Sequence, residues 1–172
     1  MTAWSPEIAN EFIRRASAEG RSFTQMQLQK LVYIAHGWSL ALTGQPLTTD
    51  HPEAWDYGPV YKSLREAVRH YGSRPVDREI RNGDFLPAAF GDNPQGNASA
   101  PLTGDESAII DRVYRDYGGY HAFQLSALTH REGTPWTTVY NGGQGRFDAI
   151  SDEAIREHFV GLAQARRTPA SA

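Results

Sequence analysis

The segment from Thr24 to Gly44 most constrains the fold, because it carries the longest helical pattern of apolar residues in the chain. Thr24 and Gln27 have the hydroxyl and amide of a capping box, which satisfies the free N–H groups at a helix start. Six apolar residues then follow at helical spacing over about five turns: Leu28, Leu31, Val32, Ala35, Trp38 and Leu42. The pattern predicts a central core helix that ends at Gly44.

The rest of the chain predicts shorter helices separated by glycine and proline. Ser5 is predicted to cap the first of them, and Gly20 to end it. Pro59 is predicted to open the third helix, which Gly72 ends. The later helices are predicted to begin at Thr103, Ala122, Pro135 and Ser151.

Extended structure is predicted only in short pieces. Residues 53–57 could form a short strand or an extended loop, and residues 76–81 alternate weakly. Residues 82–101 are rich in Gly, Pro and Asn and predict a loop excursion. The fold class is therefore mainly α, a compact helical domain with about seven helices and at most two or three short strands. We expect one domain over residues 1–165 and a polar tail over residues 166–172.

Composition excludes several classes of protein. The 172 residues include no cysteine, which excludes a disulfide scaffold, cysteine–zinc fingers, iron–sulfur clusters and a thiol nucleophile. A net charge of −3 argues against a protein that coats nucleic acid. No apolar stretch approaches the roughly 18 residues of a membrane helix. These features predict a cytoplasmic protein without a membrane partner.

Catalytic and metal-binding patterns are weak. His130 and Glu132 resemble the H-x-E of zinc deaminases, but the paired cysteines of those enzymes are missing. The chain has neither an HExxH nor a G-x-S-x-G motif. We therefore predict no enzyme, no metal and no cofactor. A hydrolase that uses His130 and Glu132 is the alternative from another functional class.

Two surface features suggest recognition. Lys62, Arg65 and Arg69 lie on one stripe of the predicted third helix, interrupted by Glu66, so they form either a solvated face or a patch for an acidic protein partner. Nucleic acid is a weaker prediction, because its binding needs several unopposed cations. Residues 53–61 hold three aromatic side chains, which suit a structural corner or a binding hot spot.

Four motifs, in order, resemble the SocA-like antitoxin family. This family is also called the Panacea domain and includes phage-associated GepA-type proteins. LQKLVYIAHGW at residues 28–38 is similar to the family's LQKLLYFAQGW, and EAWDYGPV at residues 53–60 is similar to EAWxYGPV. YG at residues 71–72 and LSALTH…PW at residues 125–136 follow the same order. The motif residues carried over as scaffold are Leu28, Lys30, Leu31, Trp38, Glu53, Trp55, Gly58, Pro59, His130, Pro135 and Trp136.

The resemblance implies a helical antitoxin that neutralises a cognate toxin by direct contact, the toxin usually being encoded beside it. It also implies an alternative, in which the protein is an adaptor that delivers the toxin to a ClpXP-type protease. The family has no agreed catalytic residues. Autoregulation by DNA binding is a third, weaker prediction. We expect the toxin-binding surface to include Tyr57, Tyr61, Lys62, Arg65 and Arg69, with Tyr57, Tyr61 and Arg65 exposed.

Overall fold

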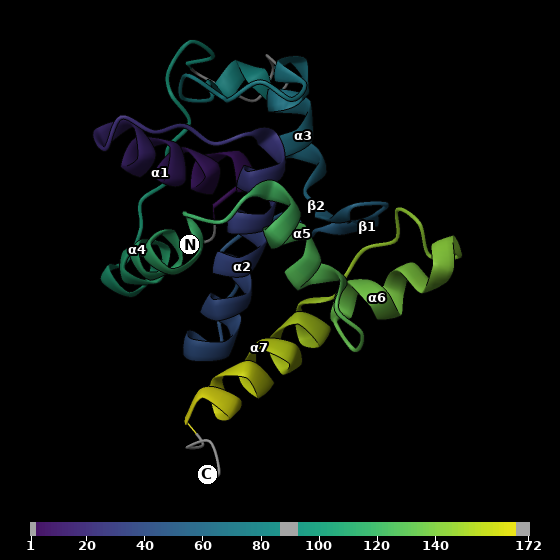
Figure 1. Cartoon of the computed structure of the whole chain (residues 1–172). Helices are drawn as coiled ribbons and strands as arrows, with labels where there is room; N and C mark the ends of the chain where they lie inside the picture. Colours follow the sequence, from purple (N-terminus) through teal and green to yellow (C-terminus); the bar gives the residue numbers. More distant parts are fainter. Residues whose placement is uncertain (1–2, 87–92, 168–172) are drawn as a thin grey trace.

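The computed structural model describes residues 3–86 and 93–167 (Figure 1). These residues form seven α-helices and one small antiparallel sheet, so the prediction of a mainly α fold is confirmed. The helices are α1 (Ser5–Ala18), α2 (Gln25–Thr43), α3 (Lys62–Val68), α4 (Gly104–Tyr117), α5 (Ala122–His130), α6 (Pro135–Tyr140) and α7 (Asp152–Arg167). The strands are β1 (Glu53–Trp55) and β2 (Gly58–Val60). Within the described ranges, no helix has the length and apolar character needed to cross a membrane.

Helix α2 lies at the centre of the fold, with α1, α4, α5 and α7 packed against it (Figure 1). Its start has the predicted capping box, in which Gln27 N donates to Thr24 Oγ1 and Thr24 N donates to Gln27 Oε1. Gly44 ends it in the left-handed conformation. The prediction that Leu42 is buried is wrong, because this residue lies on the last turn of α2 and is 56% exposed.

Helix α7 crosses α2 at a glycine. A side chain at position 37 would overlap the ring of Phe159, so Gly37 is what allows the two helices to approach. Phe159 packs edge-on against Trp38, with ring centroids 5.2 Å apart. This contact fixes α7 along the C-terminal half of α2 and places its last turns beside α4.

Two predicted helix starts are wrong. Trp4, not Ser5, is the N-cap of α1, and the Ser5 hydroxyl donates instead to Asp50 in the loop after α2. Pro59 does not open a helix, because Gly58–Val60 pairs with Glu53–Trp55 as a β-hairpin and α3 begins only at Lys62. Proline has the same φ angle in both settings, so the sequence alone did not decide between them.

The connection between α3 and α4 is mostly irregular. Residues 76–81 form no strand and pair only through isolated bridges, Phe23 with Val76 and Arg81 with Asn97. Of the predicted 82–101 excursion, residues 87–92 lie outside the described residues. The flanking segments are held by the buried side chain of Asn10, which accepts from Ile80 N and donates to Ile80 O and Ala98 O.

Helix α7 is the last element of the described chain. It continues to Arg167 and so includes the first two residues of the predicted polar tail. The apolar spacing of this helix predicts that Leu162 is buried with Ile155 and Phe159, but Leu162 is exposed, since this turn of α7 reaches beyond the core. Residues 168–172 lie outside the described residues.

Candidate protein-binding site

The β-hairpin is held by side chains that bind its backbone carbonyl groups. Lys30 Nζ on α2 donates to Pro59 O at 3.0 Å. Ser126 Oγ on α5 donates to Tyr57 O at 2.8 Å, and Trp136 Nε1 on α6 donates to Trp55 O at 2.7 Å. The motif segments that lie far apart in the sequence thus meet at one short hairpin.

The residue after the hairpin is fixed in the same way. Gln29 Oε1 accepts from Tyr61 N at 2.8 Å, and Gln29 Nε2 donates to Tyr61 O at 3.0 Å. All of these atoms are buried, so each bond satisfies a group that would otherwise lose its hydrogen bonds to water. Together the bonds fix the hairpin and the start of α3 relative to α2.

Lys30 is buried beneath the hairpin. Burial penalises its charged form and lowers the pKa of the Lys30 ammonium from 10.5 to about 7. Gly58 lies directly above it with φ of +114°, and a methyl group there would lie 2.8 Å from Thr129 Oγ1 and 3.0 Å from Lys30 Nζ. Only glycine fits this position, because both the backbone angle and the lysine exclude a side chain.

The turn of the hairpin is anchored from α6 and the loop after it. Tyr140 Oη donates to Asp56 Oδ1 at 2.7 Å, and Arg146 Nε lies 2.8 Å from the same oxygen. The Tyr140 ring stacks on Trp136, which ties the turn to the bond that Trp136 makes with Trp55. Tyr57, also in this turn, is not buried by these contacts and is 69% exposed.

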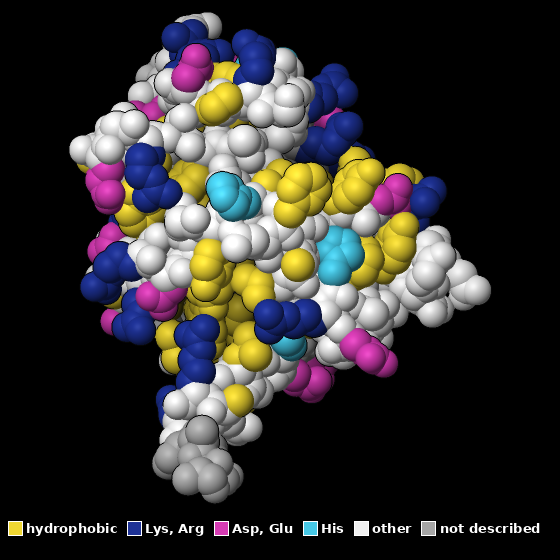
Figure 2. All heavy atoms as spheres, in the orientation of Figure 1, with side chains coloured by type: hydrophobic (Ala, Val, Ile, Leu, Met, Phe, Trp, Pro, Cys, Tyr) yellow, Lys and Arg dark blue, Asp and Glu magenta, His cyan; other side chains and the backbone are white. Residues whose placement is uncertain are grey.

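A groove runs between the hairpin and the starts of α2 and α5. Its volume is about 680 Å³. We name it the hairpin groove, and its principal side chains are Met26, Trp55, Tyr57, Arg65, Phe123 and Phe147, with Lys30 at its base. Hydrophobic side chains gather over the hairpin and α5 on the face drawn in Figure 2.

Three aromatic residues of the hairpin groove are exposed. Phe123 is 81% exposed, and Phe147 is 55% exposed beside Tyr57 in the lining. Phe147 packs edge-on against Trp55 and has φ of +71°, which is rare for an aromatic residue. Large exposed apolar side chains gathered in one concavity are typical of interaction sites, and strained backbone is often found there.

The structure brings together only part of the predicted toxin-binding set. Tyr57 and Arg65 line the hairpin groove, and the Arg65 guanidinium lies over the Trp55 ring at 4.9 Å from its centroid. The prediction that Tyr61 is exposed is wrong, because its ring is fully buried against α2. Lys62 at the start of α3 and Arg69 just after its end are exposed but do not line the groove.

Sequence reasoning missed Phe123 and Phe147. Phe123 could have been found, since it lies two residues before the buried Leu125 and therefore on the opposite side of α5. Phe147 reaches the groove because its N–H donates to Ala54 O of β1 at 2.7 Å. No local pattern indicates that long-range bond.

His130 and Glu132 are not brought together as an acid–base pair. The His130 ring lies 3.9 Å from the Trp136 ring, centroid to centroid, and Nδ1 is 2.6 Å from Ser126 O. Glu132 is exposed and lines a different cavity, beside Tyr33 and His158. Among residues 3–86 and 93–167, no cluster of three His, Asp or Glu side chains could hold a metal ion.

The fold and the converging motifs define the class of the protein. Residues 28–137 match the family described as antitoxin SocA-like, Panacea domain, which is more than half of the chain. The chain therefore belongs to the SocA-like antitoxin family. Its sequence is 30% identical over 160 residues to "Antitoxin SocA" of Caulobacter vibrioides, a match that covers 88% of this chain and 80% of that protein. No solved structure matches the chain significantly.

Proposed function

We propose that this protein is an antitoxin that neutralises a cognate toxin by direct binding, with the hairpin groove as its contact surface. The observation that carries the proposal is the grouping of exposed Tyr57, Phe123 and Phe147 around one groove beside Arg65. Aromatic residues and arginine supply most of the binding energy in protein interfaces. The family supports an antitoxin role, and the groove is our proposal for how that role is performed.

The fixed hairpin supports binding at this surface. Its backbone carbonyl groups are held by Lys30, Ser126 and Trp136, so the turn that carries Tyr57 is already ordered before a partner arrives. A preordered surface loses less conformational entropy on binding and so binds more tightly for the same contact area. The groove forms the centre of the proposed contact, and a standard interface of about 1,200–2,000 Å² would extend beyond it.

We propose that the partner is a toxin protein encoded beside this one and that the two meet in the cytoplasm. Neutralisation then needs no catalysis by this chain, only occlusion of a working surface of the toxin. The alternative is a proteolytic adaptor that presents the toxin to a ClpXP-type protease. The two mechanisms separate in a purified assay, because occlusion works with the two proteins alone whereas delivery needs the protease.

The test compares two sets of substitutions on one folded protein. Tyr57→Ala, Arg65→Ala and Phe123→Ala combined should weaken binding of the toxin encoded by the neighbouring gene by at least about 100-fold. The reason is that truncating a single anchor residue of an interface costs about 2 kcal/mol. Arg69→Ala is the matched control, because Arg69 is an exposed arginine one turn further along that lies outside the groove. Binding is measured by calorimetry and neutralisation by growth of cells that express the toxin.

The fold is checked by thermal unfolding, which the exposed substitutions should leave within a few degrees of the parent protein. If the triple variant still binds and neutralises like the parent, the hairpin groove is not the contact surface. If binding is lost only with Arg69→Ala, the exposed surface around Arg69 is the contact surface instead. Binding without neutralisation in the purified assay would favour the adaptor mechanism.

A further inference from the structure

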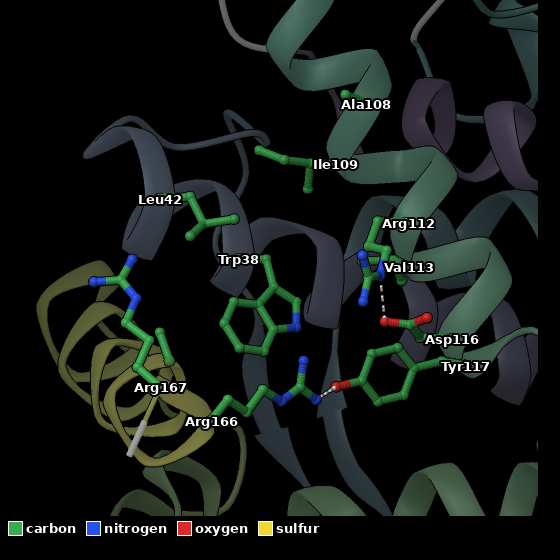
Figure 3. A pocket seen from close by; sticks show the side chains of 11 residues that line it. Trp38, Leu42, Ala108, Ile109, Arg112, Val113, Asp116, Tyr117, Arg166 and Arg167 are labelled. Atoms are coloured by element: carbon green, nitrogen blue, oxygen red, sulfur yellow. Dashed lines mark hydrogen bonds and ion pairs between the residues drawn. The ribbon is translucent and has the colours of Figure 1, made fainter. Parts of the chain in front are cut away.

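A second groove lies at the other end of α2, between α2, α4 and α7 (Figure 3). Its volume is about 400 Å³. We name it the α7 groove, and its principal side chains are Trp38, Leu42, Ala108, Arg112, Tyr117, Arg166 and Arg167. Figure 2 shows hydrophobic side chains gathered where these helices meet, with Lys and Arg side chains along the edge.

The base of the α7 groove holds a hydrogen-bond donor without an acceptor. Within residues 3–86 and 93–167, Trp38 Nε1 is the only buried side-chain nitrogen or oxygen that has no partner. An N–H group buried without an acceptor is destabilising, because it has lost its hydrogen bond to water, and a bound acceptor would remove that cost. In Figure 3 the indole nitrogen is on the side of the ring that faces Arg166 and Tyr117.

Positive charge surrounds this donor. Arg112 pairs with Asp116 at 2.8 Å, whereas Arg166 and Arg167 form no ion pair with a carboxylate of residues 3–86 or 93–167. The Arg166 guanidinium covers the Trp38 ring at 4.8 Å and donates to Tyr117 Oη at 2.8 Å. A neutral phenol is a weaker partner for arginine than a carboxylate, so an incoming acidic group would draw Arg166 away and uncover the indole.

We propose that the α7 groove is a second protein-binding site, which takes an acidic segment of a partner protein with an aliphatic side chain next to a carboxylate. The aliphatic group would fill the apolar groove beside Leu42 and Ala108. The carboxylate would bind Arg166 and Arg167, and a backbone carbonyl of the segment would accept from Trp38 Nε1. The three features of the groove, an apolar cavity, an unpaired donor and a net positive edge, match these three parts of one ligand.

This inference does not depend on the hairpin groove. The two grooves share no lining residue, and Lys30 and Trp38 lie about 12 Å apart along α2 at 1.5 Å per residue. The α7 groove can therefore be tested separately from the hairpin groove.

The experiment uses the full chain and a displayed library of random peptides. The parent protein should enrich peptides that carry Asp or Glu beside Leu, Ile or Val. Ala108→Trp should remove this enrichment, because Ala108 is exposed on α4 and a large side chain there fills the groove. Ala127→Trp is the matched control, since Ala127 is exposed on α5 and lines neither groove.

An enriched peptide is then measured against single variants. Trp38→Phe should weaken it about fivefold, the value of one neutral hydrogen bond. Arg166→Gln with Arg167→Gln should weaken it at least about fivefold and reduce its dependence on salt. In ¹⁵N spectra the indole resonance that Trp38→Phe removes should shift on binding.

Three results would overturn the proposal. One is enrichment of peptides that bind Ala108→Trp as well as the parent, and a second is enrichment without acidic residues. The third is a dimer of the free protein that Ala108→Trp dissociates, which would assign the groove to a second copy of the chain. The parent's neutralising activity is scored separately, so failure here leaves the test of the hairpin groove unaffected.

Discussion

The two ends of α2 differ in how their polar groups are satisfied. At the N-terminal half, Gln29 and Lys30 bind backbone groups of the hairpin and α3, and Trp136 binds the same hairpin from α6. At the C-terminal half, Trp38 is equally buried but its N–H has no acceptor within the described residues. At one end of α2 the buried polar groups are paired with each other. At the other end the Trp38 N–H is unpaired and lies under the long side chain of Arg166.

The difference between the two ends of α2 raises the question of which residues hold the fold and which are exposed to a partner. Several residues of the family motifs hold backbone, as Lys30, Ser126 and Trp136 do. Of the exposed aromatic residues of the hairpin groove, Tyr57 lies within the EAWDYGPV motif and Phe123 lies two residues before the LSALTH motif. Motif membership alone therefore does not separate buried residues from exposed ones, and exposure has to be taken from the structure.

The largest expected effect comes from a substitution in the hairpin, at the N-terminal half of α2 where the polar groups are paired. Gly58→Ala should lower the free energy of unfolding by about 4 kcal/mol, because a side chain at φ of +114° is strained and its methyl group would meet Thr129 and Lys30. Gly20→Ala is the control, with φ of +70° and no atom within 4 Å of the added methyl group. It should cost only about 1 kcal/mol.

Both variants are measured by urea unfolding against the parent protein. Equal losses for Gly58→Ala and Gly20→Ala would mean that only the backbone angle matters at position 58. The hairpin would then not be tightly packed on Lys30, and the contrast between the two ends of α2 would weaken.

The next effect is the pH dependence of stability that the buried Lys30 causes at the N-terminal half of α2. The pKa of buried Lys30 is about 7 in the folded protein and 10.5 when exposed, so the unfolded chain binds more protons between these values. Stability therefore rises with pH in this window, by about 2 kcal/mol from pH 7 to pH 9. Below about pH 7 both states are protonated, and the cost of burying the charge is constant.

Lys30→Met should remove this rise, since methionine has no charge to bury. Lys62→Met is the control, because Lys62 is exposed on α3 and should leave the rise in place. Unfolding in urea at the two pH values measures both variants. A rise that survives in Lys30→Met would have to come from another group, and Lys30 would not be the buried cation that the geometry describes.

Much of the fold was predictable because its signals are local. Capping boxes at Thr24 and Thr103, and the Pro135 start of α6, each depend on residues within one helical turn. The hairpin was not predictable from local signals of this kind. Its strands are three residues long, and what fixes them is contact with Lys30 and Trp136, which are distant in sequence.

The candidate site was predictable only in part for the same reason. The aromatic segment at residues 53–61 pointed to the right place, but the sequence did not separate Tyr57 in the turn from Tyr61 beneath it. Their different burial follows from Gln29, which binds the backbone of Tyr61 and turns its ring towards α2. Phe147 reaches the groove through the hydrogen bond from its N–H to Ala54 O of β1, which the residues near Phe147 in the sequence do not predict.

A matched pair of tryptophan substitutions tests the comparison most directly, and one of the two, Trp38→Phe, has the smallest expected effect. Trp136→Phe removes the bond to Trp55 O and part of the volume of a buried ring, so it should cost about 3 kcal/mol. Trp38→Phe removes an N–H that has no acceptor among the residues that the structure describes. Relief of that buried group offsets the smaller ring volume, and the net change should stay within about 1 kcal/mol. Urea unfolding of the two variants gives the difference, and equal losses would show that the Trp38 N–H is satisfied after all and that the α7 groove has no donor to offer.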